Sequence, residues 1–173
     1  DGRQVADIVL EEALARQAAG DPAAARAVRD AQRMVEEGPD KPFLSVRFEG
    51  QRGIVVGAYG LALATDDGGR NWRSLVGRIP NPRGKHLYQV RVDGREILIA
   101  GEQGALFRSQ DGGESFTELK TPYGGTFFGV IGIDSDRLLA FGLRGNVWRS
   151  TDGGTKWQRI DVGQEVTLTA GQR

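Results

Sequence analysis

The chain is poor in the residues that build thiol, metal and histidine chemistry. Among its 173 residues are no cysteine, one methionine and one histidine. The absence of cysteine excludes disulfides and thiol nucleophiles, but it does not fix a compartment. A clustered His/Cys metal set is also excluded. A Ser-His-Asp triad could run only through His86, and no nucleophile-elbow pattern accompanies that histidine.

The chain also has no net charge and no long apolar run. The 23 Lys and Arg residues balance 23 Asp and Glu residues, so whole-protein attraction to nucleic acid or to an anionic membrane is not indicated. No stretch approaches the ~20 apolar residues that cross a bilayer, and we expect no membrane insertion. A signal peptide is not present and the first residue is Asp1, so we expect a piece of a longer protein.

What the chain does contain is a short motif in three copies, with the pattern Ser/Thr-x-Asp-Gly-Gly-x-x-Trp/Phe. Its aspartates lie 44 and 41 residues apart. The motif residues are Asp67, Gly68, Gly69 and Trp72, then Asp111, Gly112, Gly113 and Phe116, and finally Asp152, Gly153, Gly154 and Trp157. A repeat of about 40–50 residues indicates a solenoid or a propeller.

Each repeat reads as four short strands, which is the content of one propeller blade. The expected strands are 43–48, 53–56, 61–65 and one from Trp72; 87–92, 96–100, 105–109 and one from Phe116; 128–133, 137–141, 146–150 and one from Trp157. A Gly-x-x-Gly turn with positive φ angles joins the second and third strands of each unit. Residues 166–170 are expected to begin a fourth unit. The predicted fold is therefore all-β, a partial β-propeller of three four-stranded blades plus the start of a fourth.

Three blades and a fraction cannot close a ring, so apolar blade faces would stay open. We therefore expect residues 43–173 to be a fragment of a larger propeller. We also expect copies of the fragment to self-associate through the open faces.

Residues 1–42 have a different composition and predict an α-helical hairpin. The first helix is expected from about Gln4 to Ala19, ending at Gly20. Asp21-Pro22 predicts the N-cap of a second helix, which ends near Glu37, before Gly38-Pro39. Its expected apolar face consists of Ala24, Ala27, Val28, Ala31, Met34 and Val35. This face is small, so the hairpin should dock on the β part, either as an arm that binds a partner or as a packed insertion between blades.

The repeated motif has a structural explanation. The aspartate can accept backbone N–H groups, the glycines can take positive φ angles, and the aromatic ring can cover the turn. An EF-hand loop needs a ladder of oxygen ligands ending in a glutamate, and that ladder is absent. We therefore expect no metal and no cofactor.

The motif resembles the Asp box of bacterial-neuraminidase-type repeats. The fuller pattern, from Val56-Gly57-x-x-Gly60 to Trp72, resembles blades of the photosystem II assembly and stability factor family and its bacterial relatives, over about 43–170. The stretch 38–44 is similar to the end of a helical insertion in those relatives. The resemblance implies a seven-bladed propeller, usually exported, that binds and stabilises other proteins without catalysis. The chain itself identifies neither its client nor its compartment.

Asp-box propellers also include sialidases and other glycan hydrolases, which leaves a glycan-processing enzyme or lectin as the alternative. Arg78-Ile79-Pro80 matches the core of a sialidase motif but follows an Asp box, whereas that motif precedes the first one. A glycosidase needs two carboxylates across a pocket. The candidates, Glu49, Glu96, Glu102 and Asp134, are scattered over turns, so we expect no enzyme activity.

A local excess of basic residues gives the most specific functional prediction. Between Arg70 and Arg91 the chain carries six Lys and Arg residues and no acidic residue. The loop Gly77–His86 connects two blades, so it should lie at the same end of the propeller as the Gly-x-x-Gly turns, opposite the Asp boxes. Arginine-rich surfaces suit carboxylates and acidic peptide segments. The candidate partner-binding residues are Tyr59, Arg78, Arg83, Lys85, His86, Gln103 and Arg144.

We therefore expect a non-catalytic scaffold that binds a partner protein, with a membrane-protein complex as the kind of client that the resemblance implies. Ordinary solvated loop charge is the other interpretation of the basic stretch. Nucleic acid is not expected as a partner, because the basic stretch is short and carries few aromatic residues.

Overall fold

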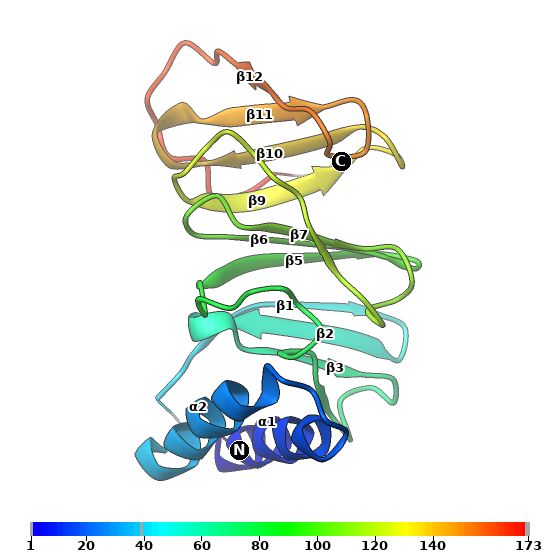
Figure 1. Ribbon diagram of the computed structural model, residues 1–173. Coiled ribbons are helices and arrows are strands. Elements are labelled where there is room, and N and C mark those ends of the chain that lie inside the picture. The colour runs from blue at the N-terminus through cyan, green and yellow to red at the C-terminus, as the bar shows by residue number, and fades with distance from the viewer. Residues whose placement is uncertain (1, 39, 172–173) are drawn as a thin grey trace.

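Three antiparallel sheets and two helices make up the molecule. The computed structural model describes residues 2–38 and 40–171. Each sheet contains four strands in chain order, and the sheets stack one behind another with the helices at one end (Figure 1). The predicted fold class is confirmed. Within the described residues, no helix has the length and apolar character needed to cross a membrane.

The sheets follow the repeat closely. Blade 1 consists of β1 (Phe43–Glu49), β2 (Arg52–Gly57), β3 (Ala62–Thr65) and β4 (Arg73–Ser74). Blade 2 consists of β5 (Leu87–Asp93), β6 (Glu96–Gly101), β7 (Leu106–Ser109) and β8 (Thr117–Glu118). Blade 3 consists of β9 (Phe127–Gly132), β10 (Leu138–Gly142), β11 (Val147–Ser150) and β12 (Gln158–Ile160). For these three blades, each strand bound predicted from the sequence lies within one residue of the observed bound.

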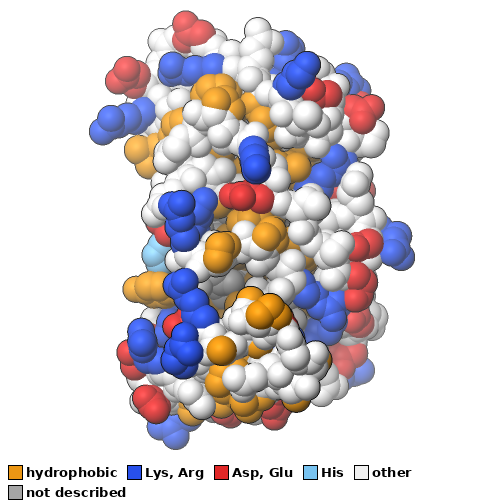
Figure 2. Space-filling view, in the orientation of Figure 1, with side chains coloured by type: hydrophobic (Ala, Val, Ile, Leu, Met, Phe, Trp, Pro, Cys, Tyr) orange, Lys and Arg blue, Asp and Glu red, His pale blue; other side chains and the backbone are white. Residues whose placement is uncertain are grey.

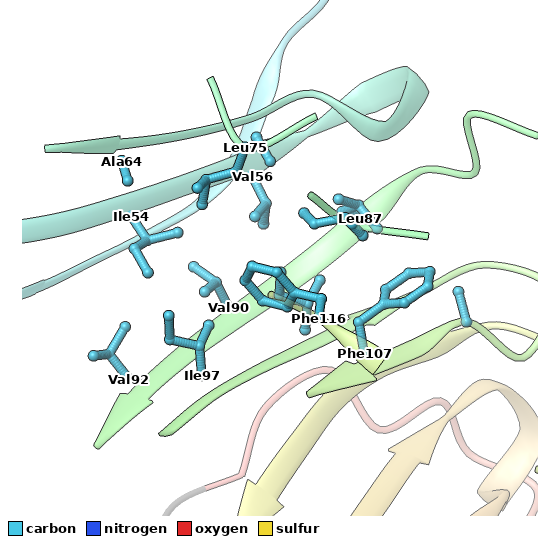
Figure 3. Packing of buried hydrophobic residues seen from close by; sticks show 14 residues of the cluster. Ile54, Val56, Ala64, Leu75, Leu87, Val90, Val92, Ile97, Phe107 and Phe116 are labelled. Atoms are coloured by element: carbon cyan, nitrogen blue, oxygen red, sulfur yellow. The ribbon is translucent and has the colours of Figure 1, made fainter. Parts of the chain in front are cut away.

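Alternating side chains of the strands fill the space between blades. In blade 1, Ile54 and Val56 point toward blade 2, whereas Val55 between them points to the opposite face. Figure 3 shows Val90 and Ile97 of blade 2 within the same cluster as Ile54. Because successive side chains of a strand face opposite sides, every central sheet can bury both of its faces.

Polar contacts repeat across the same interfaces. The N–H of Val90 donates to Ser45 Oγ at 3.2 Å, and the N–H of Val130 donates to Gln89 Oε1 at 2.7 Å. These two contacts occupy equivalent positions on successive first strands. They satisfy main-chain donors that the sheets themselves leave unused.

Arginines also bridge the blades. Arg52 of β2 donates to the carbonyl of Gly94 in blade 2 at 2.7 Å. Arg108 of β7 donates to the carbonyls of Ser135 and Gly153 in blade 3 at 2.7 and 3.1 Å. The two arginines come from different strand positions but reach equivalent turns of the following blade.

The helical hairpin covers the outer face of blade 1. It consists of α1 (Gly2–Ala18) and α2 (Ala24–Glu37), and its Val9 and Met34 pack with Val55, Leu61 and Leu63 of the sheet. The hairpin therefore docks on the β part, as predicted. The expected apolar face of α2 is largely confirmed, since Ala24, Val28, Ala31 and Met34 are buried.

Two details of the hairpin differ from the prediction. Val35 is 41% exposed, because it lies to one side of the stripe that faces the sheet. The helix begins at Ala24, so Asp21 is not its N-cap. Asp21 instead accepts the N–H of Ala23 at 2.8 Å and hydrogen bonds from Nε and Nη2 of Arg16, which fixes the turn before the helix. Pro39, part of the expected helix stop, lies outside the described residues.

The expected strand at 166–170 does not form. The segment is extended, with the N–H of Leu168 donating to the carbonyl of Gly142 and the N–H of Gly145 donating to that of Val166. Its main-chain bonds thus go to a turn of blade 3, and no described strand pairs with it. Leu168 packs against Ile131 on the far face of blade 3.

One strip of blade 1 remains open. Val46 and Phe48 of β1 are 59% and 42% exposed, whereas the equivalent Val90 and Val92 of β5 are 5% and 6% exposed. Leu44 on the same strand is also exposed. The helices cover the other strands of this face but leave the β1 strip uncovered. An open apolar sheet face is a site for association.

We expect copies of the chain to associate through this strip. Val46→Lys should weaken that association, because it places a charge where apolar contact forms. Sedimentation velocity over a concentration series measures the effect, with Val35→Lys on α2 as a control of similar exposure. A chain that stays monomeric throughout the series would contradict the expectation.

Candidate partner-binding face

The three Asp boxes close the turn between the third and fourth strand of each blade. In blade 2, Asp111 accepts the N–H groups of Glu114 and Ser115 at 3.0 Å each, and the hydroxyl of Ser109 at 2.7 Å. Ser109 Oγ in turn accepts the N–H of Gly113 at 2.8 Å. The same pattern recurs around Asp67 and Asp152. Each carboxylate therefore orders one turn.

The glycines and the aromatic residue complete each turn. The second glycines of the boxes, Gly69, Gly113 and Gly154, have φ angles of 90°, 89° and 94°. A Cβ on Gly154 would also lie 2.9 Å from Leu119 Cδ1, a contact too close to keep. Trp72 and Trp157 donate their ring N–H to the carbonyl of the second glycine at 3.0 and 2.9 Å.

These hydrogen bonds lower the pKa of all three aspartates. The main causes are the N–H of Asn71 for Asp67, the hydroxyl of Ser115 for Asp111 and the N–H of Lys156 for Asp152. A folded-state pKa below the ordinary 3.8 stabilises the fold above that pH, and the stabilisation is lost as pH falls through the folded value.

The melting temperature should thus change little from neutral pH to about pH 5 and fall steeply below about pH 4. Thermal unfolding followed by tryptophan fluorescence over a pH series measures this. Asp111→Asn should flatten the acid limb, because one of the depressed groups no longer titrates. An acid limb identical to that of the unmodified chain would show that Asp111 does not drive the transition.

The Gly-x-x-Gly turns lie at the opposite end of the sheets from the Asp boxes. Their third residues, Tyr59, Gln103 and Arg144, are exposed and have φ angles of 55°, 52° and 53°. Few non-glycine residues adopt a positive φ angle. The first glycine of each Gly-x-x-Gly turn has an extended φ angle, whereas a positive φ angle was expected. It is needed because a Cβ on Gly101 would collide with the carbonyl oxygen of His86, directly before β5.

A row of rings runs across this end. The centroids of Tyr59 and His86 lie 4.8 Å apart, those of His86 and Tyr88 6.4 Å, and those of Tyr88 and Phe128 5.1 Å. Lys41 Nζ lies 5.7 Å from the centroid of Tyr59, within the range of a cation–π contact. Figure 2 shows Lys and Arg side chains along the same edge as the single histidine.

Three β-bulges supply part of this row. Leu44, Tyr88 and Phe128 are each the extra residue at the start of the first strand of a blade, where the register shifts. A bulge redirects a side chain out of the alternating pattern. The bulges therefore present one large apolar side chain per blade at the end that carries the Gly-x-x-Gly turns.

Hydrogen bonds fix the predicted loop residues beside the row. The N–H of Tyr59 donates to His86 Nδ1 at 3.2 Å, and the N–H of His86 donates to Glu102 Oε1 at 2.9 Å. Lys85 Nζ donates to the carbonyl of Gln103 at 3.2 Å. Two neighbouring blades are thus tied together at the candidate site.

We define the basic–aromatic face by the residues that these contacts bring together, and by Arg83, which lines a groove with Tyr59. It consists of Lys41, Tyr59, Arg83, Lys85, His86, Tyr88, Gln103 and Phe128. Burial, and secondarily the charge of Glu102, raises the pKa of Tyr88, so its hydroxyl stays protonated at neutral pH. Lys41 pairs with Glu37 and Asp40, and Lys85 Nζ lies 3.8 Å from Glu118 Oε1, whereas no carboxylate of the described residues pairs with Arg83. The face therefore offers the positive charge of Arg83, apolar rings and hydroxyl donors.

Two predicted residues lie elsewhere. Arg78 forms an ion pair with Glu114 of the blade 2 Asp box, so its guanidinium points away from the basic–aromatic face. Arg144 occupies the equivalent turn of blade 3, and among the described residues no cation–π contact joins it to a ring of the row. Both remain predictions as partner-binding residues, but they are not part of the face.

Lys41, Tyr88 and Phe128 were missed in the sequence. A signal for the last two was present, because Leu87-Tyr88 and Phe127-Phe128 place two large apolar residues in succession within an alternating strand. Such a doublet indicates a bulge. No sequence pattern indicated Lys41, because its approach to Tyr59 depends on the path of the chain after α2.

The residues considered for a glycan hydrolase are engaged in other contacts. Glu96 pairs with Arg108, Asp134 pairs with Arg137, and Glu102 accepts the N–H of His86. Glu49 Oε1 accepts the N–H of Gly94 at 3.4 Å. In the part of the chain that the structure describes, no group of three or more His, Asp or Glu side chains could hold a metal.

The fold matches several solved propellers. The structure of YCF48 from Cyanidioschyzon merolae has a TM-score of 0.58 and 22% identity over 70% of this chain and 37% of that one. YCF48 bound to D1 peptide has a TM-score of 0.61 and 22% identity over 69% of this chain and 40% of that one. An ancestral GH74 enzyme has a TM-score of 0.54 and 20% identity over 68% and 18%. At these identities, the matches show the fold alone.

The chain spans about two fifths of the length of those YCF48 structures. A search of curated protein sequences found no match. The family model described as photosynthesis system II assembly factor YCF48, in contrast, matches residues 25–169, which include nearly all of α2 and all three blades. The chain therefore belongs to the YCF48 family of photosynthesis system II assembly factors.

Proposed function

We propose that the protein is a non-catalytic scaffold that binds a partner protein through the basic–aromatic face. The observation that carries the proposal is the row from Tyr59 to Phe128, flanked by Lys41, Arg83 and Lys85. Exposed tyrosines and arginines dominate the binding energy of protein interfaces. Tyr59 is 60% exposed, so it is available to a partner without rearrangement of the fold.

Family membership supports a protein as the ligand. One YCF48 structure is bound to D1 peptide, and we propose a peptide segment of a partner, within a membrane-protein complex, as the ligand here. The guanidinium of Arg83, which no carboxylate of the described residues pairs with, suits a carboxylate on that segment. Turnover of a glycoside by this chain would favour the enzyme alternative instead.

Site-specific photo-crosslinking tests which end of the molecule binds. A benzoylphenylalanine at Gln103, on the face, should form an adduct with a defined protein in the cells that make this chain. The matched control carries the same group at Arg70, an exposed residue at the Asp-box end. Mass spectrometry identifies the adducts. Equal adducts at both positions, or adducts only at Arg70, would overturn the proposal.

A further inference from the structure

A groove of about 820 Å³ lies between the helical hairpin and the connection from blade 1 to blade 2. One wall is α2, and the other is the loop that contains Pro80 and Arg83. Figure 1 shows the two helices next to this end of blade 1. The volume falls within the range of about 300–1,000 Å³ typical of ligand sites.

The floor of the groove is apolar and rigid. Ala31 and Met34 of α2 meet Leu61 of blade 1, and all three are buried in one hydrophobic cluster. Ile79, which belongs to the hydrophobic cluster between blades 1 and 2, also lines the groove. These side chains are held by packing on both sides, so the floor exists before a ligand binds.

The rim of the groove is basic. Arg26, Arg29 and Arg33 follow one another at spacings of three and four along α2, which places them on one side of the helix. Arg83 lies on the opposite wall. Arg29, Arg33 and Arg83 are exposed, and no carboxylate of residues 2–38 and 40–171 forms an ion pair with any of them.

Most of the acidic residues in the walls are already neutralised. Asp30 pairs with Arg26 at 3.5 Å. Glu37 and Asp40 lie 3.7 and 3.2 Å from Lys41 Nζ. Six basic residues and four acidic residues line the groove in all, in a protein whose net charge is zero. The uncompensated charge of the groove is therefore positive.

We infer that this groove binds an acidic, amphipathic segment of a protein. Its carboxylates would meet the arginines, which can bind them through two parallel hydrogen bonds, and its apolar side chains would cover the floor. A nucleic acid fits less well, because a phosphate backbone has no apolar side to place on that floor. The inference extends the proposed function, since the groove shares Tyr59 and Arg83 with the basic–aromatic face.

The test uses the full chain and a fluorescein-labelled peptide in which glutamate and leucine alternate. Fluorescence anisotropy should show binding, and the double variant Arg29→Glu/Arg33→Glu should weaken it by at least about tenfold. The control Arg70→Glu/Arg159→Glu makes the same change of net charge at exposed sites outside the groove and should leave binding within about twofold. Circular dichroism verifies that both variants are folded.

Three outcomes would overturn the inference. The peptide does not bind, or the two double variants weaken binding equally, or a DNA oligonucleotide of equal charge binds as tightly with the same dependence on Arg29 and Arg33. Failure here is distinguishable from failure of the proposed function. If crosslinking occurs at Gln103 but the peptide does not bind, the proposed function stands and the groove inference is wrong. If the peptide binds but no crosslink forms at Gln103, the groove inference stands and the proposed function is wrong.

Discussion

Replacement of Arg108 by methionine is expected to lower the free energy of unfolding by roughly 3–5 kcal/mol. The side chain is 7% exposed, and its guanidinium pairs with Glu96 at 2.5 Å. It also donates to the carbonyls of Ser135 and Gly153 in the next blade. Methionine would fill much of the volume but leave the Glu96 carboxylate and both carbonyls without their donor.

Urea unfolding followed by tryptophan fluorescence measures this loss. Arg149→Met serves as the matched control, because Arg149 is an exposed arginine whose side chain donates to Gln158, and the expected change is within about 0.5 kcal/mol. Adding Glu96→Leu to Arg108→Met should recover part of the stability, since it removes the unpaired carboxylate. If Arg108→Met costs less than about 1 kcal/mol, the arginine does not hold blades 2 and 3 together.

Replacement of Tyr59 by glycine is expected to weaken partner binding by about 30-fold or more, which is the effect of losing an aromatic residue that anchors an interface. The same change should not destabilise the fold. Tyr59 has a φ angle of 55°, a conformation that glycine adopts without strain. The affinity for the partner should therefore fall without a loss of stability, whereas most substitutions that remove an aromatic side chain lower both.

Arg144→Gly is the control for this experiment. Arg144 occupies the same turn in blade 3, with a φ angle of 53°, so the backbone change is matched. It lies outside the basic–aromatic face, and its loss should change affinity by less than about threefold. Surface plasmon resonance with the partner identified by crosslinking gives both affinities. Equal losses in the two variants would mean that the turns, and not the ring of Tyr59, determine binding.

Much of the fold was predictable because one motif recurs. The aspartate, the glycine pair and the aromatic residue each have one structural role, so their spacing placed every third and fourth strand. The prediction of a strand at 166–170 was wrong, because a strand forms only where another strand pairs with it.

The candidate site was less predictable, because it depends on contacts between blades. The basic loop and the Gly-x-x-Gly turns were correctly placed at one end. The sequence could not show that Arg78 turns back to Glu114, or that Lys41 reaches Tyr59 across the interval after α2. These contacts join residues 36 and 18 positions apart, and only the packed blades bring them together.

The most direct test of the account is amide hydrogen exchange of the full chain with and without the crosslinked partner. We predict new protection in the turns around Tyr59 and Gln103 and in the loop that contains His86, with no change at the Asp boxes around Asp67 and Asp111. Protection confined to the Asp-box turns would contradict the assignment of the binding face.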